Sequence, residues 1–129
     1  AMQGYEDYFE CSDRIPREEI LTLEKRAHIL LHVAWQGYEG IIASKIYEYI
    51  ASGTKILVAP SDEGAIKEIV TSSKCGEVIT EENKILDFLI SEYKHFKAGN
   101  IVQNDINQPC VQQFSRLRQV ENLVSSILS

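Results

Sequence analysis

The chain has 129 residues, of which 44% are hydrophobic and 25% are charged, a composition typical of one globular domain, residues 1–129, and not of a disordered or disulfide-dense protein. Its 19 acidic and 13 basic residues give a net charge of -6, which argues against nucleic acid as a partner, because nucleic acid is bound through basic patches. The three cysteines, Cys11, Cys75 and Cys110, form no CxxC pair, so we expect reduced thiols in a cytoplasmic protein and no metal site.

The first expected elements are a strand, a helix and a second strand. Residues 8–11 could form the first strand. A helix is expected to begin at Pro16, because proline fits the first position of a helix. Glu18 and Glu19 then lie in the first turn, where the helix dipole favours negative charge. Its apolar residues recur at helical spacing, namely Ile20, Leu23 and Ala27. Residues 28–33 form a largely apolar run without alternation, which is typical of a parallel strand buried on both faces.

A glycine-containing loop, residues 35–40, leads into a helix expected over residues 44–52. Gly53 follows the last of these residues, in the position that a C-cap glycine takes. Helical spacing predicts that one face of this helix is buried, and that face consists of Ala43, Ile46, Tyr47 and Ile50. The other face then carries three polar residues, Ser44, Glu48 and Ser52.

A second apolar strand is expected over residues 55–59, where Pro60 ends it. Ser61 or Asp62 can cap the helix that follows. The buried stripe predicted for this third helix consists of Ile66, Ile69 and Val70.

The remaining chain predicts one short strand and two more helices. Residues 77–80 form the strand, and the helix after it has an apolar stripe of Ile85, Leu86, Leu89, Tyr93 and Phe96. Residues 99–109 are polar and rich in turn formers. A last helix is expected at about residues 113–128, with Leu117, Val120, Val124 and Ile127 along one face.

Alternation of strands and helices predicts an α/β fold, a small parallel sheet with flanking helices on both faces. No apolar run approaches the roughly 20 residues that span a bilayer, so we expect a soluble chain. Ligands of such sheets bind beyond the carboxyl ends of the strands. Two loops, residues 35–44 and 60–64, are expected to open on that edge.

The first of these loops leads to residue types that suit a nucleotide. Backbone N–H groups of Ala43, Ser44 and Lys45 at the helix start could bind a diphosphate, with Lys45 adding positive charge. Glu48 lies one turn further on, and an ionised carboxylate can accept both vicinal hydroxyls of a ribose. The same spacing also predicts a simpler arrangement, an ion pair between Lys45 and Glu48 on a solvated helix face.

Residues 37–59 contain the run Ser-Lys-x-Tyr-Glu-Tyr-x-Ala-Ser-Gly at 44–53, which resembles the donor-binding signature of GT-B fold glycosyltransferases, in particular the family 4-like group. The resemblance implies a Rossmann-like fold, with this chain as the C-terminal part of the second, donor-binding domain. It implies that Glu48 binds the ribose hydroxyls. It also implies a catalytic position at Glu39, which precedes Gly40 and stands nine residues before Glu48, where the family usually has eight.

The activity implied by this resemblance is transfer of a hexosyl-type group from a UDP- or GDP-type nucleoside-diphosphate sugar to an acceptor, in bacterial polysaccharide or glycoconjugate synthesis. The family needs no cofactor. The implied partner is an N-terminal domain of the same chain, encoded upstream of Met2, which could hold the enzyme at the inner membrane. On this hypothesis residues 1–129 alone are inactive and could self-associate through the last helix.

Two other hypotheses remain open at the level of sequence. The chain could be a non-catalytic α/β interaction or regulatory module that binds a partner through its C-terminal amphipathic helix. A dinucleotide-dependent oxidoreductase ranks last, because no GxGxxG follows an expected strand. Nucleotide binding would distinguish the transferase from the interaction module.

Overall fold

The computed structural model describes residues 3–35, 37, 42–61, 64–100 and 108–129. Within these residues three parallel strands form one sheet in the order β1-β2-β3, and they comprise Ile29–His32, Lys55–Val58 and Gly76–Val78. Leu57 in the central strand pairs with Leu31 on one side and Glu77 on the other. The predicted α/β fold with a small parallel sheet is confirmed.

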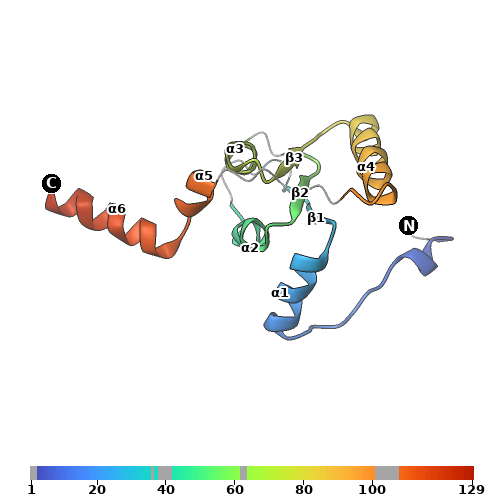
Figure 1. Cartoon of the computed structure of the whole chain (residues 1–129), viewed down its shortest axis with the longest axis horizontal. Coiled ribbons are helices and arrows are strands. Elements are labelled where there is room, and N and C mark those ends of the chain that lie inside the picture. The colour runs from blue at the N-terminus through green and yellow to red at the C-terminus, as the bar shows by residue number, and fades with distance from the viewer. Residues whose placement is uncertain (1–2, 36, 38–41, 62–63, 101–107) are drawn as a thin grey trace.

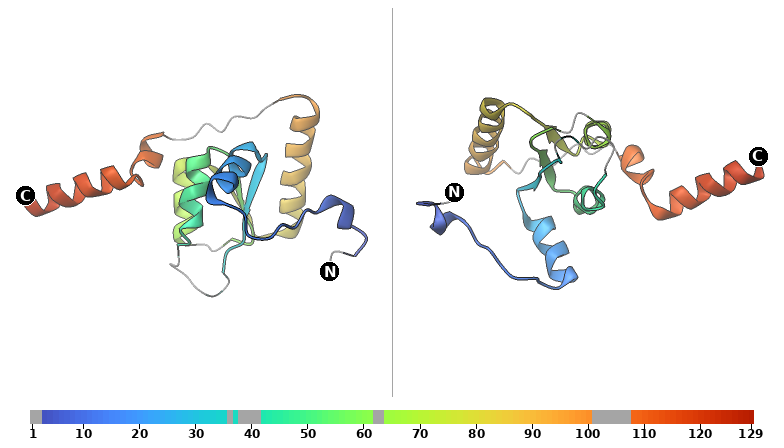
Figure 2. Two further views of the ribbon diagram at one scale, coloured as in Figure 1. Left: turned by 90° about the horizontal axis from the view of Figure 1, so that it is seen from below. Right: turned by 180° about the vertical axis from the view of Figure 1, so that it is seen from behind.

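The helices occupy both faces of this sheet (Figure 1). Helices α2 and α3 lie on one face and α4 lies on the other, as the second set of views also shows (Figure 2). Helix α1 precedes β1 and packs beside α2. The bounds are Arg17–Arg26 for α1, Lys45–Ser52 for α2, Ala65–Ser73 for α3, Glu82–Lys97 for α4, Gln108–Gln112 for α5 and Arg116–Leu128 for α6.

The hydrophobic core lies between the sheet and the α2–α3 face. Helical stripes predicted from the sequence meet the strands there, and the buried side chains are Ala34, Ile46, Ile50, Ile56, Val58, Ile66, Ile69, Val70 and Cys75. Gly53 ends α2 in the left-handed conformation, with φ of 77°, as its C-cap position predicts. Gly76 is also required by its position, because a Cβ there would collide with the Ile56 carbonyl oxygen of the neighbouring strand.

The prediction of a first strand at residues 8–11 is wrong. Glu6–Tyr8 forms a short 3-10 helix, η1, and the residues after it are exposed and lie outside the sheet. A strand is held by its hydrogen-bonded ladder, and this segment has none with β1. The described chain from residue 3 to residue 16 is therefore an arm that precedes α1.

The opposite face of the sheet is less covered than the sequence predicts. Leu31 and Val33 are 55% and 60% exposed, so β1 is not buried on both faces. Strand β1 lies at the sheet edge, and among the described helices α4 is the one on that face (Figure 1). Helix α4 turns Phe88 and Glu92 toward β2, where Lys55 meets both. Most of its predicted stripe is consequently 41–60% exposed, namely Leu86, Leu89, Tyr93 and Phe96.

Two smaller differences concern helix starts. Helix α3 begins at Ala65 after Gly64, so Ser61, which is buried, does not cap it, and Asp62 lies outside the described residues. A short helix, α5, begins within the segment expected to be irregular and packs against α3. The last helix begins at Arg116, near the start expected at about residue 113, and the Ser115 hydroxyl caps it by accepting the N–H of Arg118 at 3.2 Å. No helix of the described residues is both long and apolar enough to cross a membrane.

Candidate functional site

The start of α2 lies beyond the carboxyl end of β1, where the sequence places the ligand. The first helical hydrogen bonds run from the Ile46 N–H to the Ala43 carbonyl, at 3.0 Å, and from the Tyr47 N–H to the Ser44 carbonyl, at 3.2 Å. The amides of Ala43, Ser44 and Lys45 therefore precede the helical ladder. Glu39 and Gly40 lie outside the described residues.

Glu48 is the fourth residue of α2, and its carboxylate makes two ion pairs. Lys45 Nζ lies 2.9 Å from Oε2, and the Arg17 guanidinium of α1 lies 3.2 Å from Oε1. The hydrogen bond from Lys45 lowers the pKa of Glu48, and it outweighs the opposing effect of desolvation. Glu48 is therefore ionised at neutral pH and can only accept hydrogen bonds.

Lys45 also reaches a second carboxylate, which sequence reasoning missed. Its Nζ lies 2.5 Å from Oε1 of Glu24 on α1, and the hydrogen bonds to Glu24 and then to Glu48 raise the pKa of Lys45. Glu24 is only 5% exposed, and its Oε2 has no hydrogen-bond partner among the described residues. The available signal was its position four residues after Ile20, on the apolar face of the first helix.

These four charged residues connect α1 to α2. The Thr54 hydroxyl adds a further link, because it donates to the Glu24 carbonyl at 2.7 Å. The structure thus brings Lys45 and Glu48 together, as the ion-pair alternative predicts, and turns Lys45 toward α1. A ligand at the helix start would exchange some of these ion pairs for its own hydroxyls and phosphates.

Solvent exposure indicates which ion pairs can be exchanged. The side chains of Glu48 and Arg17 are 29% and 75% exposed, and such exposed pairs contribute only about 0–1 kcal/mol. The Glu24 carboxylate is buried, so releasing Lys45 from it would leave a buried charge unpaired and would cost several kcal/mol. Glu48 can therefore change partners while Lys45 stays bound to Glu24.

Other candidate chemistry is sparse among the described residues. No three side chains of His, Cys, Asp or Glu converge there as a metal site would require. A cavity lies beside the amino ends of β1 and β2, at the other end of these strands from the start of α2. Comparisons with family models, curated proteins and solved structures found no match to this chain.

Proposed function

We propose that the chain is the donor-binding part of a GT-B-type glycosyltransferase that uses a nucleoside-diphosphate sugar. The observation that supports this most is the position of Glu48. It is ionised, partly exposed and one turn beyond the start of a helix that follows a parallel strand. Both the helix start and the carboxylate have the chemistry that a nucleoside diphosphate requires, and the sequence around them resembles the family signature.

In this proposal the amides of Ala43, Ser44 and Lys45 at the helix start bind the diphosphate, and Glu48 accepts the ribose hydroxyls. Transfer joins an acceptor hydroxyl oxygen to the anomeric carbon while the bond from that carbon to the diphosphate oxygen breaks. The hydroxyl proton passes to a base or to the released diphosphate. Amides at the helix start stabilise the charge that develops on the leaving diphosphate, and Glu39 and Gly40 are proposed to contact the donor sugar.

The proposal requires a longer protein, because the acceptor domain and the rest of the donor site would precede Met2. Reading the source DNA upstream of the Met2 codon tests this directly. A frame that continues through a further domain with strand–helix alternation would support the transferase. A frame that begins at Met2 would argue against it.

Donor binding by the longest natural chain provides the biochemical test. Titration calorimetry with UDP and GDP should detect binding of at least one, and Glu48→Ala should weaken it by about 1–3 kcal/mol through loss of two hydrogen bonds to the ribose. Glu68→Ala is a matched control, since Glu68 is the fourth residue of α3 and is exposed. A nucleotide lacking the 2′-hydroxyl should lose affinity for the wild type and much less for Glu48→Ala. Equal losses for both proteins would remove the ribose role.

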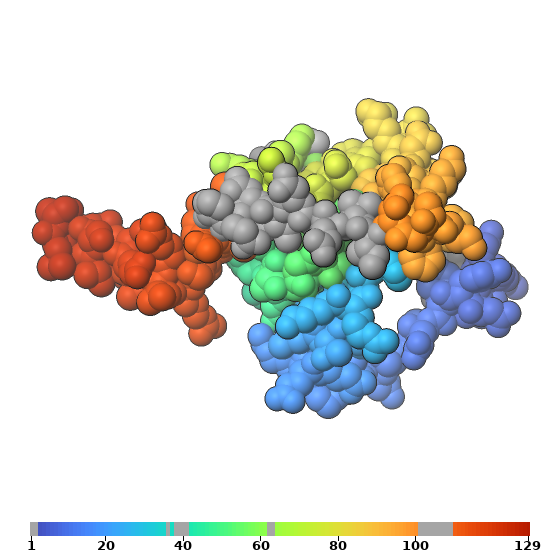
Figure 3. Space-filling model, in the orientation of Figure 1, coloured from blue at the N-terminus to red at the C-terminus, as the bar shows by residue number. Residues whose placement is uncertain are grey.

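The interaction-module hypothesis is favoured by one different observation. Helix α6 extends away from the body (Figure 3). Its predicted stripe of Leu117, Val120, Val124 and Ile127 is 46–71% exposed. A chain that binds neither nucleotide, but whose partner binding is lost when this stripe is made polar, would identify an interaction module instead of a transferase.

A further inference from the structure

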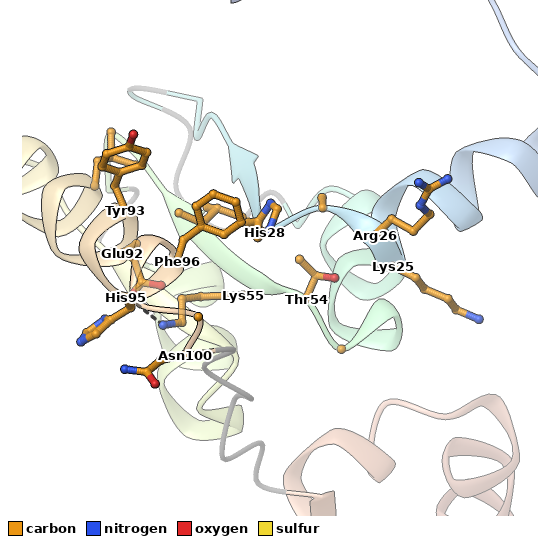
Figure 4. Close-up of a pocket in the computed structure, with 15 residues that line it drawn as sticks. Lys25, Arg26, His28, Thr54, Lys55, Glu92, Tyr93, His95, Phe96 and Asn100 are labelled. Atoms are coloured by element: carbon orange, nitrogen blue, oxygen red, sulfur yellow. Dashed lines mark hydrogen bonds and ion pairs between the residues drawn. The ribbon is translucent and has the colours of Figure 1, made fainter.

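A groove separate from the proposed donor site runs between α4 and the edge strand β1. Its cavity measures about 1010 Å³ and is bordered by the end of α1, the amino ends of β1 and β2, and the last turns of α4. His28 and Phe96 meet edge to face inside it, with ring centroids 4.6 Å apart (Figure 4). The proposed donor site lies at the carboxyl ends of the strands, so the proposed glycosyl transfer leaves this groove without a function.

The walls of the groove are largely apolar and uncovered. Ile29 of β1 lines it, and because strand side chains alternate, the exposed Leu31 lies on the same face. Leu89, Tyr93 and Phe96 of α4 form the facing wall and are 41–60% exposed. An uncovered apolar surface of this kind indicates an interaction site.

The charge at the α1 end of the groove is positive although the chain as a whole is acidic. Lys25, Arg26 and Lys55 line the groove, and the one acidic side chain among the described residues of the lining, Glu92, is paired with Lys55 at 2.8 Å. Lys25 and Arg26 therefore leave an excess of positive charge at the α1 end. The groove thus matches an acidic segment that also carries apolar side chains.

The arm before α1 is such a segment. Residues 3–13 contain four acidic residues and no basic residue, namely Glu6, Asp7, Glu10 and Asp13. Three aromatic residues lie among them and are exposed, Tyr5 by 62%, Tyr8 by 83% and Phe9 by 55%. The arm leaves the start of α1 as an extended segment outside the body (Figure 2). Helix α6 is the poorer match, because Arg116 and Arg118 outnumber its one acidic residue, Glu121.

We propose that the groove binds residues 3–13 of a second copy of the chain, so that two copies exchange their arms in a closed twofold dimer. The buried area supports this occupant. Each arm would bury the exposed parts of its three aromatic residues and cover an equal area of the partner's groove. Counted over both copies, the buried surface amounts to roughly 1,200 Å², which reaches the lower end of specific interfaces. Aromatic side chains supply the contact area, and the acidic residues meet Lys25 and Arg26.

The test is a charge exchange read by light scattering coupled to size-exclusion chromatography at low salt. Residues 1–129 without substitutions should elute as a species of twice their 14.6 kDa mass at high concentration. Reversal of the groove charges in Lys25→Glu/Arg26→Glu, or of the arm charges in Glu6→Lys/Asp7→Lys, should each weaken the dimer about tenfold or more, since like charges then face one another. An equimolar mixture of the two variants should dimerise again, because each arm then meets a groove of opposite charge.

Arg116→Glu/Arg118→Glu on α6 is the matched control and should leave the dimer unchanged. If the groove variant fails to fold by circular dichroism, the arm variant still decides the question, because its substitutions lie in the exposed arm. Excess peptide with the sequence of residues 3–13 should also dissociate the wild-type dimer. A monomer at all concentrations, a dimer insensitive to the arm reversal, or failure of the mixture of two folded variants to re-form a dimer would each overturn the proposal.

Discussion

Replacement of Lys45 by methionine should destabilise the chain more than its surface position suggests. Lys45 forms an ion pair with the carboxylate of Glu24, and the side chain of Glu24 is only 6% exposed. Removing the ammonium group leaves a buried carboxyl group with neither oxygen bound, since Oε2 has no hydrogen-bond partner among the described residues. Loss of one partner from a buried ion pair costs about 3–5 kcal/mol. Lys45 itself is 40% exposed, so water reduces the expected cost to about 2–3 kcal/mol.

A double-mutant cycle distinguishes this cause from loss of packing. In Glu24→Gln the side chain is neutral and still offers Lys45 an acceptor oxygen, so its own cost should stay near 1 kcal/mol. Lys45→Met should then cost at least about 1 kcal/mol less in the Glu24→Gln background than in the wild type. Urea denaturation followed by circular dichroism at one protein concentration measures all four proteins. Lys94→Met, an exposed substitution on α4, should change stability by less than about 0.5 kcal/mol.

Equal effects of Lys45→Met in the two backgrounds would refute the reasoning, because they would show that the buried charge of Glu24 is not the cause. The cycle does not depend on any ligand. It tests the ion-pair network separately from the proposed transferase.

Three further predictions concern pH and local structure. The pKa of Glu48 lies below its ordinary value of 4.5 in the folded chain. Its ion pairs therefore stabilise the fold above that value, and this stabilisation is lost as pH falls through the folded pKa. The free energy of unfolding of Glu48→Gln should consequently fall less steeply with pH over this range. Gly76→Ala should destabilise the chain by about 3 kcal/mol or more in urea, since β2 and β3 must separate. Ser115→Ala should lower the free energy of unfolding of α6 by about 1 kcal/mol, seen as faster hydrogen exchange of the Arg118 amide.

Features that depend on local chemistry could be predicted from the sequence. Gly53 ends α2 because a left-handed residue satisfies the last carbonyls, and Ser115 begins α6 because its hydroxyl accepts a free N–H. Ile46 and Ile50 of the predicted stripe are buried as their spacing requires, while Ala43 and Tyr47 are half-buried. Each of these outcomes is decided within a few residues along the chain.

Features decided by tertiary contacts could not be predicted in this way. Helix α4 was expected to bury Leu89 and Phe96, but it is Phe88 and Glu92 that contact Lys55, and Leu89 and Phe96 line the groove instead. Glu24 was missed for the same reason. Its ion-pair partner, Lys45, is 21 residues away along the chain, and no local spacing indicates that pair.

Within the candidate site, the sequence predicted the helix start and the juxtaposition of Lys45 with Glu48, but it left open which groups they bind. The burial of the network bears on that choice. Glu24 holds Lys45 from the buried side, whereas Glu48 lies at the exposed end with Arg17. Exposed ion pairs contribute little, so ribose hydroxyls could replace them without disturbing the buried pair. A network that served stability alone would gain little from its exposed end. The partly exposed, ionised Glu48 is therefore the group on which the functional proposal depends, and the buried Glu24–Lys45 pair is what keeps Lys45 beside it.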